Sequence, residues 1–488
     1  MPNSRMTHVD DRGTASRHKL IGDYVGAIAD SNAALFLGAG LSRESGYVDW
    51  KRLMRGAAKE LGLDLDLEQD LVAVAQYYLN LSGQNRHSLS QMIVDEFGQR
   101  GDYTENHRII GRLPIQTIWT TNFDTLIERA ISDAGREVDV KSRQADIPIA
   151  RKRRDVVLYK MHGDVAHPHE VVICKEDYER YARTNPVFQT ALEADLVSKT
   201  FLFLGFSFAD PNLNYMLGHL RTLLDDNQHQ HFAIMRRARE RWPETEDRKR
   251  AHEYERNKQR LLLLELARYG IRTCLVDSFS EVTEILHMIE QGALSNNVFV
   301  SGSANKFTDD FNETRTRDLC MALGQRLVIE GRKLISGFGL NIGAELVKGA
   351  ILALYNTRDA FEDRIVLRPF PREIPSDIPE PEFLDDYRRA IVAQSGVAVF
   401  ICGTSRSNLI SAGVMDEYRI VRAMQKVPIP IGATGFAARE IWNELREERE
   451  EIYGGHVGPD LYDRLNDSSL SGEELVGVVF EIMDAVNG

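Results

Sequence analysis

Cysteine is scarce in this chain of 488 residues, and its four cysteines are scattered. They are Cys174, Cys274, Cys320 and Cys402. The spacing excludes the two closely spaced thiolate pairs typical of a structural zinc site, and it offers no disulfide framework. We therefore expect no zinc, and we expect a reducing compartment, the cytoplasm.

The chain also lacks a net positive charge and long apolar runs. Lys and Arg number 60 against 73 Asp and Glu, which gives a net charge of −13. This balance disfavours a general binder of nucleic acid or of anionic membranes, because both favour basic surfaces. The apolar runs fall short of the roughly 20 residues that span a bilayer. Residues 1–15 are polar and are expected to be a flexible N-terminal segment without a signal peptide.

The chain instead has four short motifs in series, each placed where an apolar run ends. The motifs are Gly38-Ala39-Gly40-Leu41-Ser42, Thr121-Asn122-Phe123-Asp124, His162-Gly163-Asp164 and Gly205-Phe206-Ser207. The runs before them span residues 33–37, 115–120, 156–161 and 200–204. Such runs are typical of buried parallel strands. In an open α/β sheet, ligands bind in loops at the carboxyl ends of the strands, which is where these motifs would lie.

The glycine-containing motifs suit a nucleotide. Glycine lets the backbone approach a ligand closely, and N–H groups at the start of a helix suit a diphosphate. An ordinary turn from strand to helix is the alternative for the first motif. The candidate dinucleotide-binding residues are Gly38, Ala39, Gly40, Ser42, Gly205 and Ser207.

Three polar side chains in the second and third motifs are candidates for catalysis. Asn122 offers a donor and an acceptor, and Asp124 offers an acceptor, although both could instead cap a helix at 125–134. His162 ends an apolar strand, and its imidazole titrates near neutrality, so it can take a proton from a hydroxyl or a water. The alternative is a structural histidine. Asp210, which precedes a proline, is interpreted as a helix cap.

The second half restarts an alternation of strands and helices, which predicts a second parallel sheet. Its strands, expected at 297–300, 333–336, 364–367 and 397–401, end in glycine-containing loops that suit an anionic, nucleotide-sized ligand. Arginine forks suit phosphates, and a glutamate can accept from ribose hydroxyls. An exposed surface is the alternative for the arginines. The candidate ligand-binding residues are Gly302, Ser303, Gly337, Arg368, Arg372, Arg388 and Glu417.

The order of the first four motifs resembles the NAD-binding core of the sirtuins, and the second half is similar to the SLOG family of nucleotide-sensing, Rossmann-like domains. The two together resemble the Thoeris A family of bacterial antiphage effectors. The resemblance implies an α/β fold with two doubly wound domains, the first with a mainly helical insert at 50–106. The expected boundaries are 16–290 for the sirtuin-like domain, 291–296 for a linker and 297–488 for the SLOG-like domain. A charged stretch at 236–260 is expected to be an exposed helix or pair of helices.

The same resemblance implies an NAD glycohydrolase that releases nicotinamide and ADP-ribose, with Asn122 and His162 as the catalytic pair. The activating signal would be a cyclic ADP-ribose isomer made by a partner with a TIR domain, and the assembly would be a homotetramer. An NAD-dependent protein deacylase with a regulatory nucleotide-binding domain is the alternative. Sirtuin deacylases usually carry a zinc module of two C-x-x-C pairs, which this chain lacks. A non-catalytic NAD sensor is disfavoured by the presence of both catalytic candidates.

Overall fold

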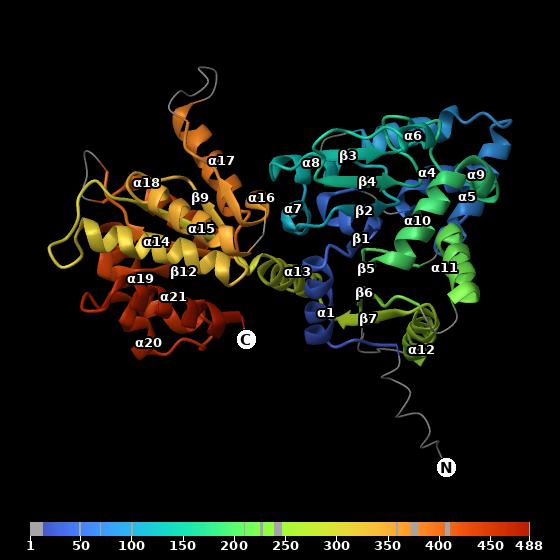
Figure 1. The fold of residues 1–488 in the computed structure, drawn as a ribbon. Coiled ribbons are helices and arrows are strands. Elements are labelled where there is room, and N and C mark those ends of the chain that lie inside the picture. The colour runs from blue at the N-terminus through green and yellow to red at the C-terminus, as the bar shows by residue number, and fades with distance from the viewer. Residues whose placement is uncertain are drawn as a thin grey trace, which may run out of the picture. The chain divides into compact units, whose positions relative to one another are not determined.

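The computed structural model describes residues 13–47, 50–68, 70–98, 101–208, 210–224, 228–238, 246–357, 360–371, 379–405 and 410–487. They form two compact units, one ending at Ile289 and the other beginning at Glu290 (Figure 1). Each unit is built on a parallel sheet, of seven strands in the first and five in the second. The predicted fold class, two parallel α/β domains, is confirmed. No described helix is both long enough and apolar enough to cross a membrane.

The first sheet has the strand order β3-β4-β2-β1-β5-β6-β7, and all neighbours are parallel. Its strands are β1 (Ala33–Leu37), β2 (Thr117–Thr120), β3 (Val138–Lys141), β4 (Val156–Lys160), β5 (Thr200–Leu204), β6 (His231–Arg236) and β7 (Ile271–Val276). The four strands that precede the motifs are β1, β2, β4 and β5, which are neighbours. The chain switches sides of the sheet at β1: β2, β3 and β4 lie on one side of this strand, and β5, β6 and β7 lie on the other. The motifs therefore share the edge where such sheets bind ligands.

Helices cover this sheet, and a helical insert between β1 and β2 packs on the motif loops. The helices are α1 (Arg17–Ala29), α2 (Ala39–Ser42), α3 (Trp50–Leu53), α4 (Arg55–Glu60), α5 (Leu71–Leu81), α6 (His87–Phe97), α7 (Glu105–Arg112), α8 (Leu126–Asp133), α9 (Lys175–Thr184), α10 (Pro186–Ser198), α11 (Pro211–Leu224), α12 (Glu246–Arg268) and α13 (Phe279–Leu294). Phe123 of the second motif is buried among apolar residues of α3 to α6, and the ring of Phe97 meets it edge-on at 5.7 Å. Val171 and Ile173, which follow the third motif, join the same cluster. The insert thus covers the loops after β2 and β4.

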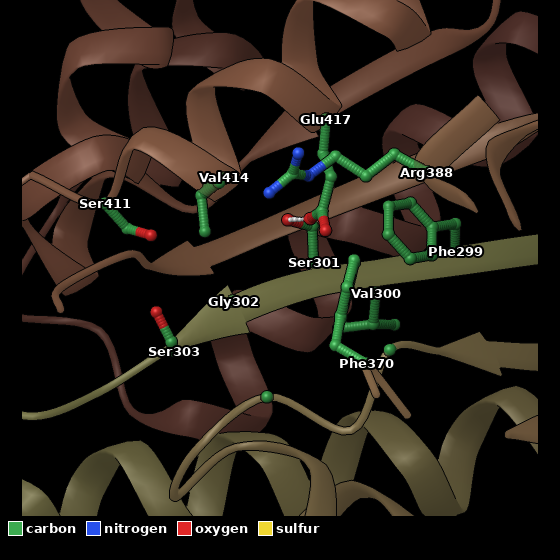
Figure 2. A pocket seen from close by; sticks show the side chains of 13 residues that line it. Phe299, Val300, Ser301, Gly302, Ser303, Phe370, Arg388, Ser411, Val414 and Glu417 are labelled. Carbon is green, nitrogen blue, oxygen red and sulfur yellow. Dashed lines mark hydrogen bonds between the residues drawn. The ribbon is translucent and has the colours of Figure 1, made fainter. Parts of the chain in front are cut away.

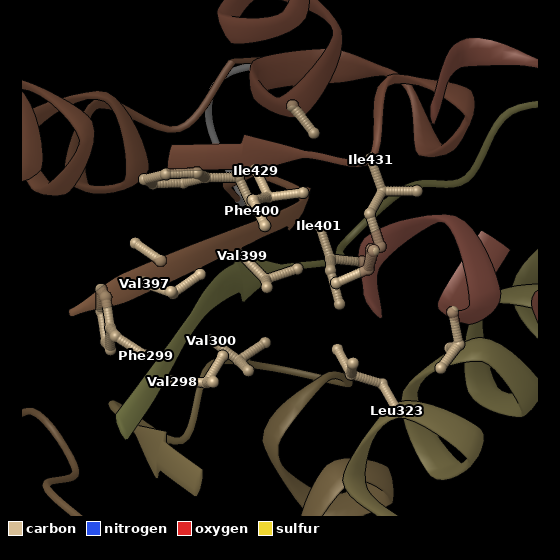
Figure 3. Packing of buried hydrophobic residues seen from close by; sticks show 14 of the residues in the cluster. Val298, Phe299, Val300, Leu323, Val397, Val399, Phe400, Ile401, Ile429 and Ile431 are labelled. Atoms are coloured by element: carbon tan, nitrogen blue, oxygen red, sulfur yellow. The ribbon is translucent and has the colours of Figure 1, made fainter. Parts of the chain in front are cut away.

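The second sheet has the strand order β10-β9-β8-β11-β12. Its strands are β8 (Asn297–Ser303), β9 (Lys333–Ser336), β10 (Ile365–Leu367), β11 (Val397–Cys402) and β12 (Val427–Pro430). Its helices are α14 (Glu313–Ile329), α15 (Gly343–Thr357), α16 (Phe361–Arg364), α17 (Glu380–Val392), α18 (Ala412–Ala423), α19 (Phe436–Ile452), α20 (Pro459–Asp463) and α21 (Gly472–Asn487). The core forms on both faces of β8 and β11, where Val298, Val300, Val399 and Ile401 pack with Leu323 of α14 (Figure 3).

The structure differs from the sequence-based expectation at several elements. Strands β3, β6 and β12 were not predicted. The stretch expected as an exposed helix begins with Arg236, which ends β6, and the described helix α12 starts only at Glu246. Helix α13 runs to Leu294, so four of the six residues expected as a linker at 291–296 are helical. Strand β12 contains two prolines, which an edge strand tolerates because one side of its backbone needs no partner.

Strand β4 ends in a buried lysine that joins the loops after β2 and β4. The ammonium of Lys160, whose side chain is 1% exposed, donates to the backbone oxygens of Asp124 at 2.6 Å and Phe123 at 3.3 Å. It also pairs with Glu128 at 2.8 Å and with Asp164. Burial acts to lower the pKa of Lys160, but the two carboxylates outweigh it and raise that pKa. The lysine is therefore a charged tie between two of the motif loops.

We expect Lys160→Met to lower the free energy of unfolding by about 3–5 kcal/mol, because it leaves the carboxylates of Glu128 and Asp164 buried without their counter-charge. Denaturant unfolding followed by circular dichroism measures this change. The matched control is Lys19→Met, which removes an exposed ion pair with Asp23 at 2.7 Å and should cost less than about 1 kcal/mol. Equal losses in the two variants would contradict the role assigned to Lys160.

Candidate functional site

The loops after β1 and β5 touch through their backbones, and this contact accounts for their glycines. The Gly38 N–H donates to the oxygen of Leu204, and the Gly40 N–H donates to the oxygen of Gly205, both at 2.9 Å. A Cβ at Gly38 or Gly40 would lie 2.6 or 2.8 Å from the Gly205 oxygen, too close for any side chain. Gly205 itself has a φ of +64°, a region that favours glycine. Gly40, Gly205 and Ser207 are exposed at the carboxyl edge of the sheet.

Asn122 is buried at the end of β2 with one side-chain atom unused. Its amide nitrogen donates to Ser42 Oγ at 3.1 Å and to the oxygen of Gly38 at 3.3 Å. Its backbone N–H donates to Thr120 Oγ1. Its Oδ1 is buried yet has no hydrogen-bond partner among the described residues. A buried acceptor without a partner is costly, so a ligand donor at this position would be favoured.

Asp124 and Ser42 serve the loop structure as well as the site. Asp124 Oδ1 accepts from the N–H of Leu126 at 3.0 Å, which supports the alternative of a helix cap, here at the start of α8. Its Oδ2 accepts from Ser42 Oγ at 2.8 Å. Ser42 is buried, and its hydroxyl is hydrogen-bonded to both Asn122 and Asp124. Ala39, which begins α2, is half-buried. The structure thus gathers these predicted residues into one hydrogen-bonded group.

His162 is buried at the end of β4, with 2% of its surface exposed. The rings of Tyr178 and Tyr181 meet it edge-on at 5.4 and 6.3 Å. Burial lowers the pKa of His162 from its ordinary value of 6.5, against the opposing effect of Asp210 and Asp177. The imidazole is therefore neutral at pH 7 and able to accept a proton.

The interpretation of Asp210 as a helix cap alone was incomplete. Its Oδ1 does accept from the N–H of Leu213 at 2.9 Å, in the first turn of α11. Its Oδ2, however, lies 3.2 Å from Nε2 of His162, at hydrogen-bonding distance but without the alignment of a hydrogen bond. The available signal was that Asp210 follows the fourth motif, which shares an edge with His162.

A second site lies at the carboxyl ends of β8, β9 and β11, in the other unit. It is a cavity of about 170 Å³. Figure 2 shows Arg388 and Glu417 reaching toward it from above β8, with Phe370 and Ser411 at its sides. The lining residues are Phe299, Val300, Ser301, Gly302, Ser303, Gly337, Gly339, Phe370, Arg388, Ser411, Gly413, Val414 and Glu417.

Among the described lining residues of this cavity, Arg388 and Glu417 are the charged ones. Arg388 is 14% exposed, lies over the ring of Phe370 at 5.5 Å, and stands 3.8 Å from Asp416. Its Nε is buried with no hydrogen-bond partner among the described residues. Glu417 accepts from Ser301 Oγ, and burial raises its pKa to about 7. The cavity thus presents an unused donor beside a carboxyl that is half neutral near pH 7, which suits an anionic ligand with hydroxyl groups.

Most of the predicted ligand residues of this unit meet at the cavity. Gly302, Ser303, Gly337, Arg388 and Glu417 all line it. Arg368 does not: it is exposed after β10, an edge strand that lies two places from β8 in the sheet. Arg372 lies outside the described residues.

The described part of the chain contains no cluster of three or more His, Cys, Asp or Glu that could hold a metal ion. Its four cysteines are free and buried.

Comparison with known proteins gives matches over nearly the whole chain. Residues 116–272 match the SIR2-like domain, and residues 281–486 match STALD, the Sir2- and TIR-associating SLOG family. The chain is 38% identical to the NAD(+) hydrolase ThsA of Bacillus cereus (strain MSX-D12), over 96% of this chain and 98% of that protein. It is 36% identical to the NAD(+) hydrolase ThsA of Cytobacillus dafuensis, over 96% of each. It is also 36% identical to that of Acinetobacter baumannii (strain 532279), over 96% of this chain and 98% of the relative.

Identity at this level over the full length of the relatives, together with a SIR2-like sheet followed by a SLOG sheet, shows that the chain belongs to the ThsA family.

Proposed function

We propose that this protein is the NAD hydrolase effector of a Thoeris antiphage system, and that a signal bound in its SLOG cavity switches it on. The relatives named NAD(+) hydrolase ThsA support the reaction, and the association of STALD domains with TIR domains supports the signal. The structural observation that carries the proposal is the buried Asn122 oxygen, which has no hydrogen-bond partner in the described part of the chain and lies on the same sheet edge as the neutral base His162. An acceptor that positions the ribose and a general base both speed cleavage of the nicotinamide–ribose bond.

The reaction breaks the bond between nicotinamide and C1 of the ribose through a transition state with positive charge on the ribose. Asn122 Oδ1 accepts from a ribose hydroxyl or from the nicotinamide amide and so holds the sugar in place. His162 takes a proton from the attacking water or from a ribose hydroxyl. The exposed residues Gly40, Gly205 and Ser207, with the half-buried Ala39 and the buried Gly38 behind them, form the loop edge that contacts the rest of the dinucleotide.

In the second unit we propose that Arg388 binds a phosphate of a cyclic ADP-ribose isomer and that Glu417 contacts a ribose hydroxyl. A cavity of about 170 Å³ is smaller than the roughly 300 Å³ of pockets that enclose a whole ligand, so it takes a ribose–phosphate part of the signal. Gly302, Ser303 and Gly337 complete the cavity floor. The signal would come from a partner with a TIR domain, in the cytoplasm, and the effector would act as a homotetramer. Light scattering on the purified protein measures that assembly.

His162→Ala and Asn122→Ala should each lower kcat for nicotinamide release by about two orders of magnitude or more, the usual scale for a positioned base. The measurement is nicotinamide release from NAD, with and without an acyl-lysine peptide, alongside a thermal melt. His167→Ala, on the same loop as His162, is the matched control and should retain the wild-type rate. Near-normal turnover by folded His162→Ala protein would refute the assignment, and release that requires the peptide would favour a deacylase.

Arg388→Ala should weaken binding of the activating cyclic ADP-ribose isomer about ten- to a hundred-fold, because it removes a charge-assisted hydrogen bond worth about 1.5–3 kcal/mol. Half-maximal activation should shift to higher ligand concentration by a similar factor, while turnover without ligand stays the same. Calorimetric titration with a panel of cyclic isomers measures the first quantity, and NAD turnover the second. Arg368→Ala, exposed outside the cavity lining, is the matched control. A larger effect for Arg368→Ala would show that the phosphate lies elsewhere.

A further inference from the structure

We infer that Asp210 is a positioning residue for the reaction, whose carboxylate orients His162 and selects the ring nitrogen that takes the proton. The inference rests on the proposed function, because it assigns a role to the neighbour of the proposed base. Asp210 Oδ2 lies 3.2 Å from Nε2 of His162, and the two side chains are 7% and 2% exposed. Hydrogen bonds in active sites are often poorly aligned before the substrate binds, so the unaligned contact between Asp210 and His162 is compatible with a hydrogen bond in the substrate complex.

Capping of α11 does not by itself account for the placement of this carboxylate. The cap uses only Oδ1, which accepts from the N–H of Leu213 at 2.9 Å. The other oxygen faces the imidazole in a nearly closed environment, where a carboxylate oxygen without a donor is costly. The cap also fixes the side chain, since Pro211 follows directly and the N–H of Asn214 donates to the Asp210 backbone oxygen at 3.1 Å. These contacts fix the backbone of Asp210, and the bond from Leu213 to Oδ1 orients its carboxylate so that Oδ2 faces His162.

Asp177, a second carboxylate of the described residues that acts on the imidazole, is already paired. Asp177 of α9 also acts to raise the pKa of His162, but its carboxylate pairs with Arg86 at 2.6 Å. It further accepts from the N–H groups of Ile173 and Cys174 and from the Cys174 thiol. Asp177 thus has donors on both oxygens.

Two tyrosines also pack on the ring, but they are neutral at pH 7. Burial raises the pKa of both Tyr178 and Tyr181 above the ordinary value of 10.0. The hydroxyl of Tyr181 donates to the backbone oxygen of Met161 at 3.1 Å. Among the described neighbours, Asp210 is therefore the group whose free carboxylate oxygen meets the imidazole.

A carboxylate at Nε2 has a definite chemical consequence. It stabilises the tautomer with hydrogen on Nε2, which leaves the lone pair on Nδ1 to accept the proton. As the attacking water forms its bond to ribose C1, its proton passes to Nδ1, and the electron pair of the breaking C–N bond passes to nicotinamide. His162 then carries a positive charge beside the Asp210 carboxylate, which stabilises it.

Asp210→Asn tests this role, because the amide oxygen keeps the cap of α11 while the charge is lost. We expect kcat for nicotinamide release to fall about 10²- to 10⁴-fold, the range for a misoriented base, with KM changed less than about twofold. Removing a group that raises the pKa of His162 should also move the acid limb of the kcat/KM profile to lower pH. Asp70→Asn, at the cap of α5 where Asp70 accepts from Ala73, is the matched control and should change neither quantity.

The outcomes separate this inference from the proposed function. If His162→Ala is inactive while Asp210→Asn keeps the wild-type kcat and acid limb, Asp210 is only a cap and the inference is overturned. If His162→Ala is itself active, the assigned base is wrong and the proposed function fails first. Should Asp210→Asn be less stable, rates are divided by the folded fraction from near-UV circular dichroism, and the position of the acid limb does not depend on that fraction.

Discussion

The contacts of the buried Lys160 ammonium are the interaction on which the edge that carries Asn122 and His162 depends. It joins the backbone of the Asn122 loop to carboxylates on α8 and on the loop of His162, so two catalytic candidates on separate strands are fixed to one point. A charge in such a place is tolerated only when all its hydrogens are used, and four acceptors surround this one. The same requirement limits how far either loop can move without breaking the group. Preorganisation of this kind is what a site acting on a charged transition state needs.

Around Lys160, most polar groups of this sheet edge are hydrogen-bonded to other groups of the protein, and a few polar atoms have no such partner among the described residues. Backbone contact between the loops of β1 and β5 uses the glycines, and Ser42 occupies Asp124 and the amide nitrogen of Asn122. Among the described residues of this edge, the atoms left without a hydrogen-bond partner include Asn122 Oδ1 and His162 Nε2, with Asp210 Oδ2 facing the latter. Asn122 and His162 are buried, and the helical insert covers the loops that carry them, so these atoms are largely shielded from bulk water. There each hydrogen bond to a substrate counts for more than it would in water.

The local sequence pattern predicted the strand ends well, because an apolar run followed by glycine or a polar residue is typical of the end of a buried strand. It located Asn122 and His162 and the sheet that carries them. It did not predict Lys160 or the contact of Asp210, since their partners come from loops far along the chain and only the fold brings them together. Arg368 and Arg388 show the same limit: both sit near strand ends or helices in the sequence, but only Arg388 reaches the cavity. Strand β12 was missed because its two prolines are unfavourable anywhere except at a sheet edge.

Energetics constrain the switching that we propose for the second cavity. A ligand shifts an equilibrium only by the difference between its affinities for the two states. Moving a protein from about 1% to about 99% active requires roughly 5.5 kcal/mol of such difference. One charge-assisted hydrogen bond from Arg388 supplies about 1.5–3 kcal/mol at most. Further differential contacts are therefore needed, and the other polar side chains of the described lining, Ser301, Ser303, Ser411 and Glu417, are placed to add them. In the proposed mechanism, a cavity that held the signal by its phosphate alone would bind it without activating the enzyme fully.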